Sequence, residues 1–336
     1  MVGTALGGQA FNGQTFNELG PLFLLLLALV IDAAVGDWIA RALPDPAALA
    51  QRFCAWADKR LNRAERGKTA RLLRGTLVVL VLLLAAVLIG LAVEWIGAQS
   101  RGWAVELVVL LATLRGRAAW VRVRAVRRAL EKGGASAGQE AVAPLTRRHA
   151  FSLDEHGIAR AAIEAAAKSF ARKVVTPVFA YALLGVPGLL VWAVVAGADA
   201  ALGNPGVRHE RFGLTAARLD DALNAIPVRL AGLLLALAAP FAGASLGGAG
   251  RTMLRDGGKS ASFNMGWPVA AMAGALGLSL GGPHRDGGVV ITEPWIGDGR
   301  ARAVPADIGK ALAVYAVAGL MLVGLVALLM WGIAAI

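Results

Sequence analysis

Residues 75–93 read GTLVVLVLLLAAVLIGLAV, an apolar run about as long as the ~20-residue helix that crosses the hydrocarbon core of a bilayer. Residues 21–36 (PLFLLLLALVIDAAVG) and 311–336 (ALAVYAVAGLMLVGLVALLMWGIAAI) are runs of the same kind. Residues 174–202 and 227–246 are apolar but contain Gly and Pro, which indicates either spans or re-entrant hairpins. We therefore expect an all-α, polytopic integral membrane protein with about four to six transmembrane or re-entrant helices plus cytoplasmic amphipathic helices.

The composition excludes an ordinary soluble domain. Of the 336 residues, 57% are hydrophobic and 17% are charged, and the mean hydropathy is +0.62, whereas soluble domains are about half apolar and about a quarter charged. Cys54 is the only cysteine, so no intramolecular disulfide can form. Residues 1–19 contain no Lys or Arg, which a cleaved signal peptide needs ahead of its apolar core, so we expect the first apolar helix to remain as an anchor.

The net charge of +12 is concentrated in two segments beside apolar runs. Nine Lys and Arg residues fall within 41–74 and nine more within 115–148. The positive-inside rule places both basic segments, 41–74 and 115–173, in the cytoplasm, and we expect the chain in the bacterial inner membrane. Anionic lipid head groups account for this charge, so we expect membrane lipids as partners and no nucleic acid.

We expect one membrane domain, residues 1–336, because no repeat and no low-complexity linker interrupts the chain. Residues 103–114 are short for a crossing and predict a tilted or partly interfacial helix. The Gly-rich residues 132–138 predict a flexible joint between a basic helix at about 116–131 and a second helix at about 153–172.

Two polar segments separate the later apolar runs. They are 203–226, a motif-bearing loop and helix, and 247–308, a polar loop with a partly buried helix. The first segment contains most of the densest charged block of the chain, RHERFGLTAARLDDALNAIP at 208–227. Ionisable groups beside a membrane are costly, so this block indicates a site. We expect its helix to be capped by Thr215 and ended by Pro227.

The spacing of polar residues on that helix allows two interpretations. Arg218 and Asp221 are three residues apart, and Asp220 and Asn224 are four apart, so the two pairs project from adjoining faces. Such a face offers the carboxylate and amide oxygens that bind Mg²⁺. The alternative is an Arg218–Asp221 ion pair that only orders a helix lying on the membrane.

Familiar catalytic patterns are incomplete in this sequence. DGGKS at 256–260 lacks the first glycine of a phosphate-binding loop, and the Gly-x-Ser-x-Gly matches at 134–138 and 243–247 lack a strand-turn-helix setting. The four histidines have neither HExxH spacing nor cysteine partners, so we expect no structural zinc site. The remaining candidates are carboxylates: Asp32, Asp37, Glu164, Asp199, Glu210, Asp220, Asp221 and Asp298.

Ordered sequence blocks run through most of the chain. They are Asp32 with Gly36 and Asp37, RHERF at 208–212 leading into ARLDD at 217–221 with Asn224, Pro227 and Arg229, AGALG at 273–277 with LGGP at 280–283, and EPWIGD at 293–298. In these blocks, from Asp32 to about Asp307, the chain resembles the adenosylcobinamide-phosphate synthase family of cobalamin biosynthesis, called CbiB or, in some bacteria, CobD.

This resemblance implies an inner-membrane enzyme that uses Mg²⁺ and ATP to join the carboxylate of cobyric acid, a corrinoid, to the amine of aminopropanol or its phosphate. A carboxylate and an amine do not condense in water unless the acid is activated, commonly as an acyl phosphate. The roles implied are catalytic for Asp220, Asp221, Glu164 and Asp199, substrate-binding for Arg148, Arg208, His209, Glu210, Arg218, Asn224 and Asp298, and metal-binding for Asp32, Asp37 and Asp221.

The chain departs from the family pattern at specific positions. Where the family reads roughly Glu-Thr-Val-Ala-Glu-Asn-Thr-x-Asp-Gly, residues 164–173 read EAAAKSFARK. Only Glu164 remains of three acids, and the other two are replaced by Lys168 and Arg172, which cannot ligate Mg²⁺. The early Gly-Asp-Pro and His-Pro pairs of the family correspond to GDW at 36–38 and Asp45-Pro46.

Two functions therefore remain open from the sequence. The first is the family reaction, with Mg²⁺, ATP and a corrinoid substrate. The second is a catalytically inactive homologue, an accessory subunit or sensor in which Lys168, Arg172 and Lys173 meet an anionic lipid, a ligand or a membrane protein partner; no cofactor is then expected.

Overall fold

Helices dominate the structure, as the apolar runs predict. The computed structural model describes residues 20–63, 65, 67–146, 148–203, 208–260, 264–286 and 289–334. Within these residues, five helical stretches are long and apolar enough to cross a membrane: Pro21–Leu61, Lys68–Gly97, Glu155–Leu202, Leu214–Ala238 and Pro305–Ile333. The prediction of an all-α membrane protein is confirmed. That the first apolar helix remains as an anchor stays a prediction, and residues 1–19, from which it was argued, lie outside the described residues.

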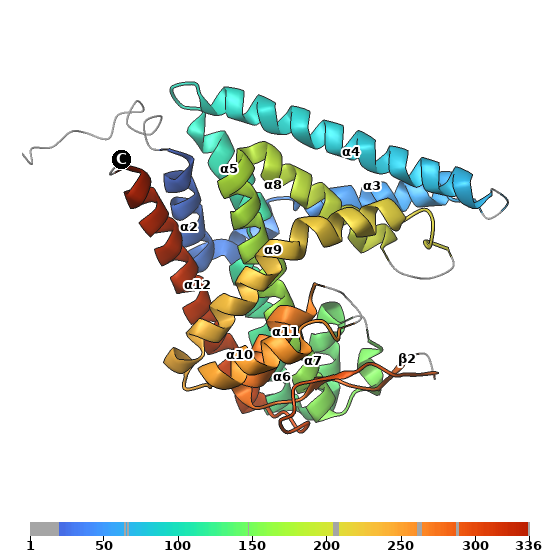
Figure 1. Cartoon of the computed structure of the whole chain (residues 1–336), viewed down its shortest axis with the longest axis vertical. Helices are drawn as coiled ribbons and strands as arrows, with labels where there is room; N and C mark the ends of the chain where they lie inside the picture. Colours follow the sequence, from blue (N-terminus) through green and yellow to red (C-terminus); the bar gives the residue numbers. More distant parts are fainter. Residues whose placement is uncertain are drawn as a thin grey trace, which may run out of the picture.

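Apolar and basic helices alternate in the first half of the chain (Figure 1). In order they are α2 (Pro21–Ala42), α3 (Pro46–Leu61), α4 (Lys68–Gly97), α5 (Trp103–Thr113) and α6 (Gly116–Val142), followed by the short 3-10 helices η1 (Ala143–Leu145) and η2 (Ala150–Ser152). Asp45 begins α3 by accepting a hydrogen bond from the backbone N–H of Ala47, and Pro46 occupies the first helical position, where its missing N–H costs nothing.

The second half contains the remaining helices and two small ladders. The helices are α7 (Glu155–Phe170), the π-helix η3 (Ala171–Val175), α8 (Thr176–Leu202), α9 (Leu214–Ala238), the 3-10 helix η4 (Pro240–Ala242), α10 (Leu246–Asp256), α11 (Gly266–Leu276) and α12 (Pro305–Ala334). Strand β1 (Leu280–Gly281) pairs antiparallel with β4 (Trp295–Ile296), and β2 (His284–Asp286) pairs antiparallel with β3 (Val289–Ile291). Figure 1 shows α2 and α12 side by side, with α6, α7, α10 and α11 gathered at one end of the molecule.

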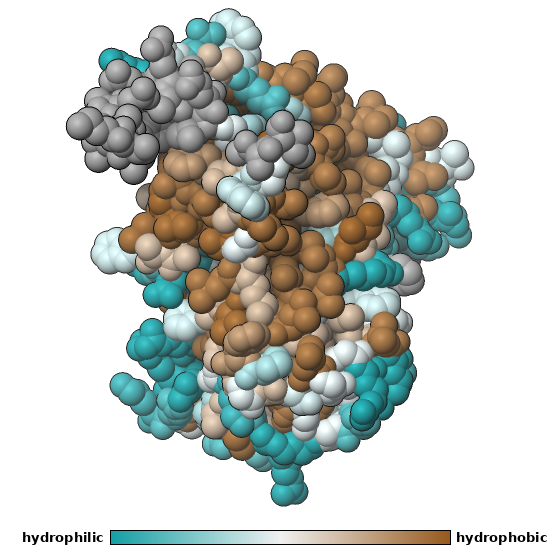
Figure 2. Space-filling model, turned by 60° about the vertical axis from the view of Figure 1, so that its left-hand side comes forward, coloured by the Kyte–Doolittle hydropathy of each residue, from teal (hydrophilic) through white to brown (hydrophobic). Residues whose placement is uncertain are grey.

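The surface carries the apolar band that a membrane protein needs. Figure 2 shows apolar residues spread over the middle of one face, with hydrophilic residues gathered below them. Large exposed side chains of α12 contribute to the apolar surface, among them Leu320, Leu328 and Trp331. An exposed apolar surface of this extent indicates contact with lipid or another protein.

Helix α9 corrects two sequence expectations. It begins at Leu214 and runs through Pro227 to Ala238, so Thr215 is not its N-cap and Pro227 does not end it. The Thr215 hydroxyl instead lies 2.7 Å from that of Thr76 on α4. Pro227 is buried, and membrane helices tolerate an internal proline where neighbouring helices enclose the bend. The span expected at 227–246 is therefore the second half of a longer helix whose first half carries the charged block.

The joint expected at residues 132–138 is helical apart from one residue. Helix α6 continues to Val142, and only Gly134 departs from helical geometry, at φ 62° and ψ −154°. Gly138 packs so closely on Leu130 that an added Cβ would lie 2.6 Å from its Cδ2 atom. The expected joint is therefore a sharp kink at Gly134 between two helical segments, which glycine permits because it has no Cβ; its flexibility stays a prediction.

The short apolar helix expected at 103–114 and the irregular one expected at 174–202 are both present. Helix α5 has 11 residues. Helix α8 leaves helical geometry at Leu184 and at Gly185, whose φ is 60°, inside the region where a hairpin was expected. The carboxylate of Glu94 stabilises this break by accepting a hydrogen bond from the backbone N–H of Val186 at 3.1 Å.

Glycines allow the apolar helices to approach backbone to backbone. A Cβ added at Gly90 of α4 would lie 2.5 Å from Cα of Pro187 on α8. One added at Gly197 of α8 would lie 2.1 Å from the carbonyl oxygen of Ala47 on α3. Since apolar attraction between helices is weak in lipid, close packing of small residues carries much of the association.

We predict that Gly90→Ala lowers the stability of the protein by about 1–3 kcal/mol, because the new methyl group must push the backbones of α4 and α8 apart. The measurement is the apparent melting temperature in detergent. Gly324→Ala on α12 is the matched control, since nothing lies within 4 Å of an added Cβ there. An equal effect of both substitutions would show that the α4–α8 contact is not tight.

Buried Asp256 fastens the segment after α11 to the end of α10. Its Oδ2 atom accepts a hydrogen bond from Arg255 at 2.8 Å and from the backbone N–H of Gly297 at 2.8 Å, and its Oδ1 atom lies 2.7 Å from Lys259 Nζ. The hydrogen bond from Arg255, supported by those from Lys259 and Gly297, lowers the pKa of Asp256 well below its ordinary value of 3.8.

We predict that this fastening weakens in acid. Because the pKa of Asp256 is lower in the folded state, its stabilisation is fully present above pH 3.8 and is lost as the pH falls through the folded value. Asp256→Asn should therefore speed hydrogen exchange at Gly297 at neutral pH, and the difference from wild type should shrink below pH 3.8. Asp298→Asn, which removes an exposed partner of Arg255, should change exchange less.

Candidate functional site

Glu164 of α7 is a carboxylate buried in the interior of the protein. Only 5% of its surface is exposed, and its neighbours Ile163 and Ala165 are buried as well. A run of alanines, at 161–162 and 165–167, lets surrounding elements close over this helix. A carboxylate in such a place is tolerated only when charges and hydrogen bonds satisfy both of its oxygens.

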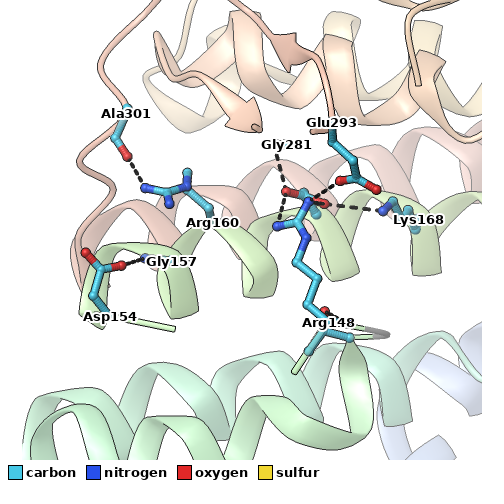
Figure 3. A network of polar contacts seen from close by, with 10 residues as sticks. Arg148, Asp154, Gly157, Arg160, Lys168, Gly281, Glu293 and Ala301 are labelled. Atoms are coloured by element: carbon cyan, nitrogen blue, oxygen red, sulfur yellow. Dashed lines mark hydrogen bonds and ion pairs between the residues drawn. The ribbon is translucent and has the colours of Figure 1, made fainter. Parts of the chain in front are cut away.

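Four nitrogen atoms from three groups satisfy Glu164 (Figure 3). Arg148 approaches with both terminal nitrogens, at 3.2 Å from Oε1 and 3.3 Å from Oε2. The backbone N–H of Gly281 in β1 donates to Oε1 at 2.9 Å, and Lys168 Nζ lies 3.3 Å from Oε2. Arg148 also binds Glu293 at 2.9 Å, so one guanidinium bridges two carboxylates.

The charge on Arg148 is secured by these contacts. Burial acts to lower the pKa of Arg148, but the charge of Glu164, together with the hydrogen bond that Arg148 donates to Glu293, raises this pKa above its ordinary value. Arg148 therefore remains a fixed cation, and the substrate-binding role expected for it competes with two carboxylates that already occupy it.

The second cluster forms around Arg172. Its guanidinium pairs with the carboxylate of Asp220 on α9 and lies 3.6 Å from Asp199 at the end of α8. Arg172 belongs to η3, whose wide π-turn follows α7 without interruption; such turns occur frequently at functional sites. Two residues expected to be catalytic, Asp199 and Asp220, thus come together with a cation between them.

Lys173 extends the same arrangement toward α3. Its ammonium lies 3.5 Å from Asp45 Oδ2, and Arg115 Nε lies 3.8 Å from the same oxygen. Arg115 also donates to the carbonyl oxygens of Ala40 and Leu43 at 2.6 and 2.8 Å. Arg115, beside Asp45, therefore joins three helix ends: the start of α6, the end of α2 and the N-cap of α3.

The remaining polar residues of α9 face different partners. Asn224 is fully buried and accepts a hydrogen bond from Thr176 at 3.3 Å, while its amide donates to the carbonyl oxygen of Asp220. Asn264 donates to the carbonyl oxygen of Asp221 at 2.7 Å. Among the described residues, no carboxylate pairs with exposed Arg218, so the alternative Arg218–Asp221 ion pair is not formed.

The motif at 208–212 lies against α3. Arg208 Nη2 lies 2.8 Å from Asp58 Oδ2, and His209 Nε2 lies 3.4 Å from Asp58 Oδ1. Asn62 donates to Asp58 at 2.7 Å and to the carbonyl oxygen of Arg208 at 2.9 Å. Glu210 is exposed and pairs with neighbouring Arg211. These contacts hold the motif in place and leave Glu210 outside the two clusters.

The carboxylates expected to bind metal lie in separate settings. Asp32 accepts a hydrogen bond from the backbone N–H of Arg117 at 3.1 Å, and Asp37 pairs with Arg41 at 2.8 Å. Asp221 is placed on α9 beside Asn264. In the part of the chain that the structure describes, no three His, Cys, Asp or Glu side chains converge to hold a metal ion. Asp298, which was expected to bind substrate, is exposed and pairs with Arg255, outside both ion-paired clusters.

Sequence reasoning missed several partners. Asp58 lies on α3 and Asn62 follows it, in a segment that was predicted only to be basic. Glu293 belongs to the EPWIGD block, but no role was predicted for it. Asp58 is one of three acids among the nine bases of residues 41–74, and no pattern in the sequence distinguishes it from the other two. The π-helix has no signal in the sequence that we can identify.

Comparisons with known proteins cover nearly the whole chain. A family profile described as CobD/Cbib protein matches residues 25–315. The cobalamin biosynthesis protein CobD of a Sinorhizobium sp is 39% identical over 88% of this chain and 93% of its own length. The protein of the same name from Rhodobacter capsulatus is 35% identical over 92% of this chain and 98% of its own length. The one from Brucella suis biovar 1 is 34% identical over 88% of this chain and 92% of its own length. No solved structure matches.

The matched region includes every helix from α3 to α11 and both ion-paired clusters. The identity is well above the level that chance produces over such a length. The chain therefore belongs to the CobD/CbiB family and is a membrane protein of the cobalamin biosynthesis type.

Proposed function

We propose that this chain serves cobalamin biosynthesis as a non-catalytic membrane subunit, in which ion pairs occupy the inherited reaction site. One observation carries the proposal: each base that departs from the family motif contacts a carboxylate. Lys168 contacts Glu164, Arg172 contacts Asp199 and Asp220, and Lys173 contacts Asp45. Side-chain cations stand beside the acids that the family resemblance assigns to catalysis.

The donor set does not fit the Mg²⁺ and ATP of the family reaction. Magnesium requires near-octahedral oxygen ligands at about 2.0–2.1 Å, with a carboxylate oxygen turned toward it. Both oxygens of Glu164 face nitrogen donors. Asp220 pairs with Arg172 through Oδ2, and its Oδ1 atom is a single buried oxygen without a hydrogen-bond partner among the described residues. A divalent cation placed there would meet the fixed positive charges of Arg148 and Arg172 at short range.

One contact joins two departures from the family pattern. Lys173 stands where the family has glycine, and Asp45 stands where it has histidine. The two side chains pair at 3.5 Å. A new acid that balances a new base supports a rebuilt and stable site, because an unpaired charge in a partly buried place is destabilising.

The same residues offer a surface to a partner. Side chains of Lys168 and Lys173 are 42% and 37% exposed, so their ammonium groups face outward as well as toward their pairs. We infer a membrane protein partner with acidic groups opposite them. The proposed setting is the bacterial inner membrane, crossed several times, with the basic segments 41–74 and 115–173 in the cytoplasm.

The family reaction is the second candidate function. Identity of 39% to a CobD protein along nearly its full length favours it, as does the retention of Glu164, Asp220 and Asp221. In that reaction, Mg²⁺ and ATP would activate the corrinoid carboxylate for attack by an amine. Arg172 would then have to leave Asp220 when substrate binds.

We predict that the wild-type gene does not restore cobalamin synthesis in a strain that lacks its CobD synthase. The measurement is growth that depends on cobalamin, with the Sinorhizobium CobD protein as the positive control and immunodetection of the membrane fraction as the check on expression. Restored growth with the wild-type chain would establish the family reaction and reject the non-catalytic role.

A second prediction tests whether the ion pairs hold the site together. Arg172→Gln leaves Asp220 and Asp199 without their cation, so it should lower the free energy of unfolding by about 3 kcal/mol. Lys168→Gln should lower it by about 1 kcal/mol or less, because Arg148 and Gly281 still satisfy Glu164. The double variant Arg172→Gln/Asp220→Asn should be more stable than Arg172→Gln alone in detergent melting experiments. A double variant that is the least stable of the set would show that Arg172 acts by packing.

A further inference from the structure

A groove of about 340 Å³ lies between α6 and α12. Helix α6 lines it with Trp120, Arg124 and Arg127. Helix α12 lines it with Gly309 and with apolar side chains that include Leu312 and Ala316. None of these residues takes part in the two ion-paired clusters. The lining combines cations on one wall with apolar surface on the other.

The aromatic ring in this groove is fixed and holds two cations. Trp120 Nε1 donates to the carbonyl oxygen of Leu312 at 3.1 Å, which ties the indole to α12. The guanidinium of Arg117 lies 4.8 Å from the ring centroid and that of Arg124 lies 5.3 Å from it. Contact with the ring restrains both guanidinium groups, so less entropy is lost when an anion binds them.

Positive charge in the groove is only partly balanced. Arg127 Nε binds Glu131 at 2.8 Å. Within the described residues, no carboxylate pairs with Arg124. Gly309 lets the Arg127 guanidinium lie directly against α12, since a Cβ at this position would lie 2.5 Å from Arg127 Nη1. Arg124 and Arg127 both line the groove, so both can reach an anion that enters it.

The groove lies where α12 enters its membrane-spanning part. Tyr315 donates to the carbonyl oxygen of Gly116 at 3.0 Å, which places the start of α6 beside this point of α12. From Tyr315 to Ala334, α12 is apolar over about the 20 residues that cross a bilayer. Leu320 is 69% exposed one helical turn beyond Ala316, so an apolar track leads out of the groove. Figure 2 shows, on one face of the molecule, hydrophilic surface below apolar surface.

We propose that this groove binds an anionic phospholipid. The phosphate is held by Arg124 and Arg127, the guanidinium groups supply paired N–H donors, and an acyl chain lies along Ala316 and Leu320 of α12. Basic pockets beside membrane helices recognise anionic head groups in this way. The apolar track distinguishes this occupant from free phosphate, which gains nothing from the α12 wall.

The test uses the full-length protein in nanodiscs of phosphatidylcholine with or without phosphatidylglycerol, and native mass spectrometry of the lipid retained. Arg124→Gln/Arg127→Gln should weaken retention of phosphatidylglycerol on the order of tenfold, since each basic group near anionic lipid contributes about 1 kcal/mol, a factor of about five. Arg122→Gln/Arg128→Gln is the matched control, because it removes the same charge from the same helix outside the groove. The control pair should retain phosphatidylglycerol nearly as well as wild type.

Two further arms keep the proposal falsifiable. Gly309→Leu keeps every charge but places a side chain where the Arg127 guanidinium now lies, so it should also release the lipid. The melting temperature in detergent checks that each variant is folded. Inorganic phosphate should fail to displace the bound lipid. Equal losses in the two arginine pairs, retention by Gly309→Leu, or displacement by inorganic phosphate would each overturn the assignment to an anionic lipid at this groove.

Discussion

The burial of Glu164 is the constraint on which the polar half of the structure depends. A carboxylate enclosed by α7 and its neighbours must be met by donors on every side, and each donor comes from a different segment: Arg148 from the chain before η2, Lys168 from the next turn of α7, and the N–H of Gly281 from β1. Arg148 then fixes Glu293. One buried charge thereby sets the position of the segment from β1 to β4 against α7, and removing it would leave Arg148 without one of its two partners.

The change from acids to bases in this chain follows from the same physics. Several carboxylates close together repel one another, and a site that contains them needs cations to be stable. A bound metal ion can supply that charge; so can lysine and arginine. In this chain Arg172 lies between Asp199 and Asp220, and Lys173 lies beside Asp45. Side chains of the protein thus supply positive charge beside these acids. Both oxygens of Glu164 and the Oδ2 atom of Asp220 meet nitrogen donors, whereas the Oδ1 atom of Asp220 is buried without a hydrogen-bond partner among the described residues.

Local sequence patterns were sufficient to predict the apolar helices, because a membrane requires about 20 apolar residues in a row whatever the surrounding fold. The Gly and Pro residues of 174–202 indicated either a span or a re-entrant hairpin, and α8 does leave helical geometry at Gly185. Local patterns failed at Pro227, where enclosure by other helices, which no local pattern records, lets α9 continue. They also could not pair Lys173 with Asp45 or Asn62 with Arg208, since these partners lie 128 and 146 residues apart. The sequence therefore identified most of the acids of the two clusters and the bases Lys168, Arg172 and Lys173. It did not indicate which acid each base would pair with.

Arg115 shows how the polar contacts organise the membrane helices. The last carbonyl groups of a helix have no partners within it, and at the end of α2 the Arg115 guanidinium binds those of Ala40 and Leu43. The backbone N–H of Arg115 donates to the carbonyl oxygen of Lys173 in η3, and its side chain lies beside Asp45 at the cap of α3. Since α6 begins at the next residue, its direction is set where α2, α3 and η3 meet. The orientation of its basic face, and so the wall of the groove along α12, is a consequence of satisfying helix ends at the edge of the apolar region.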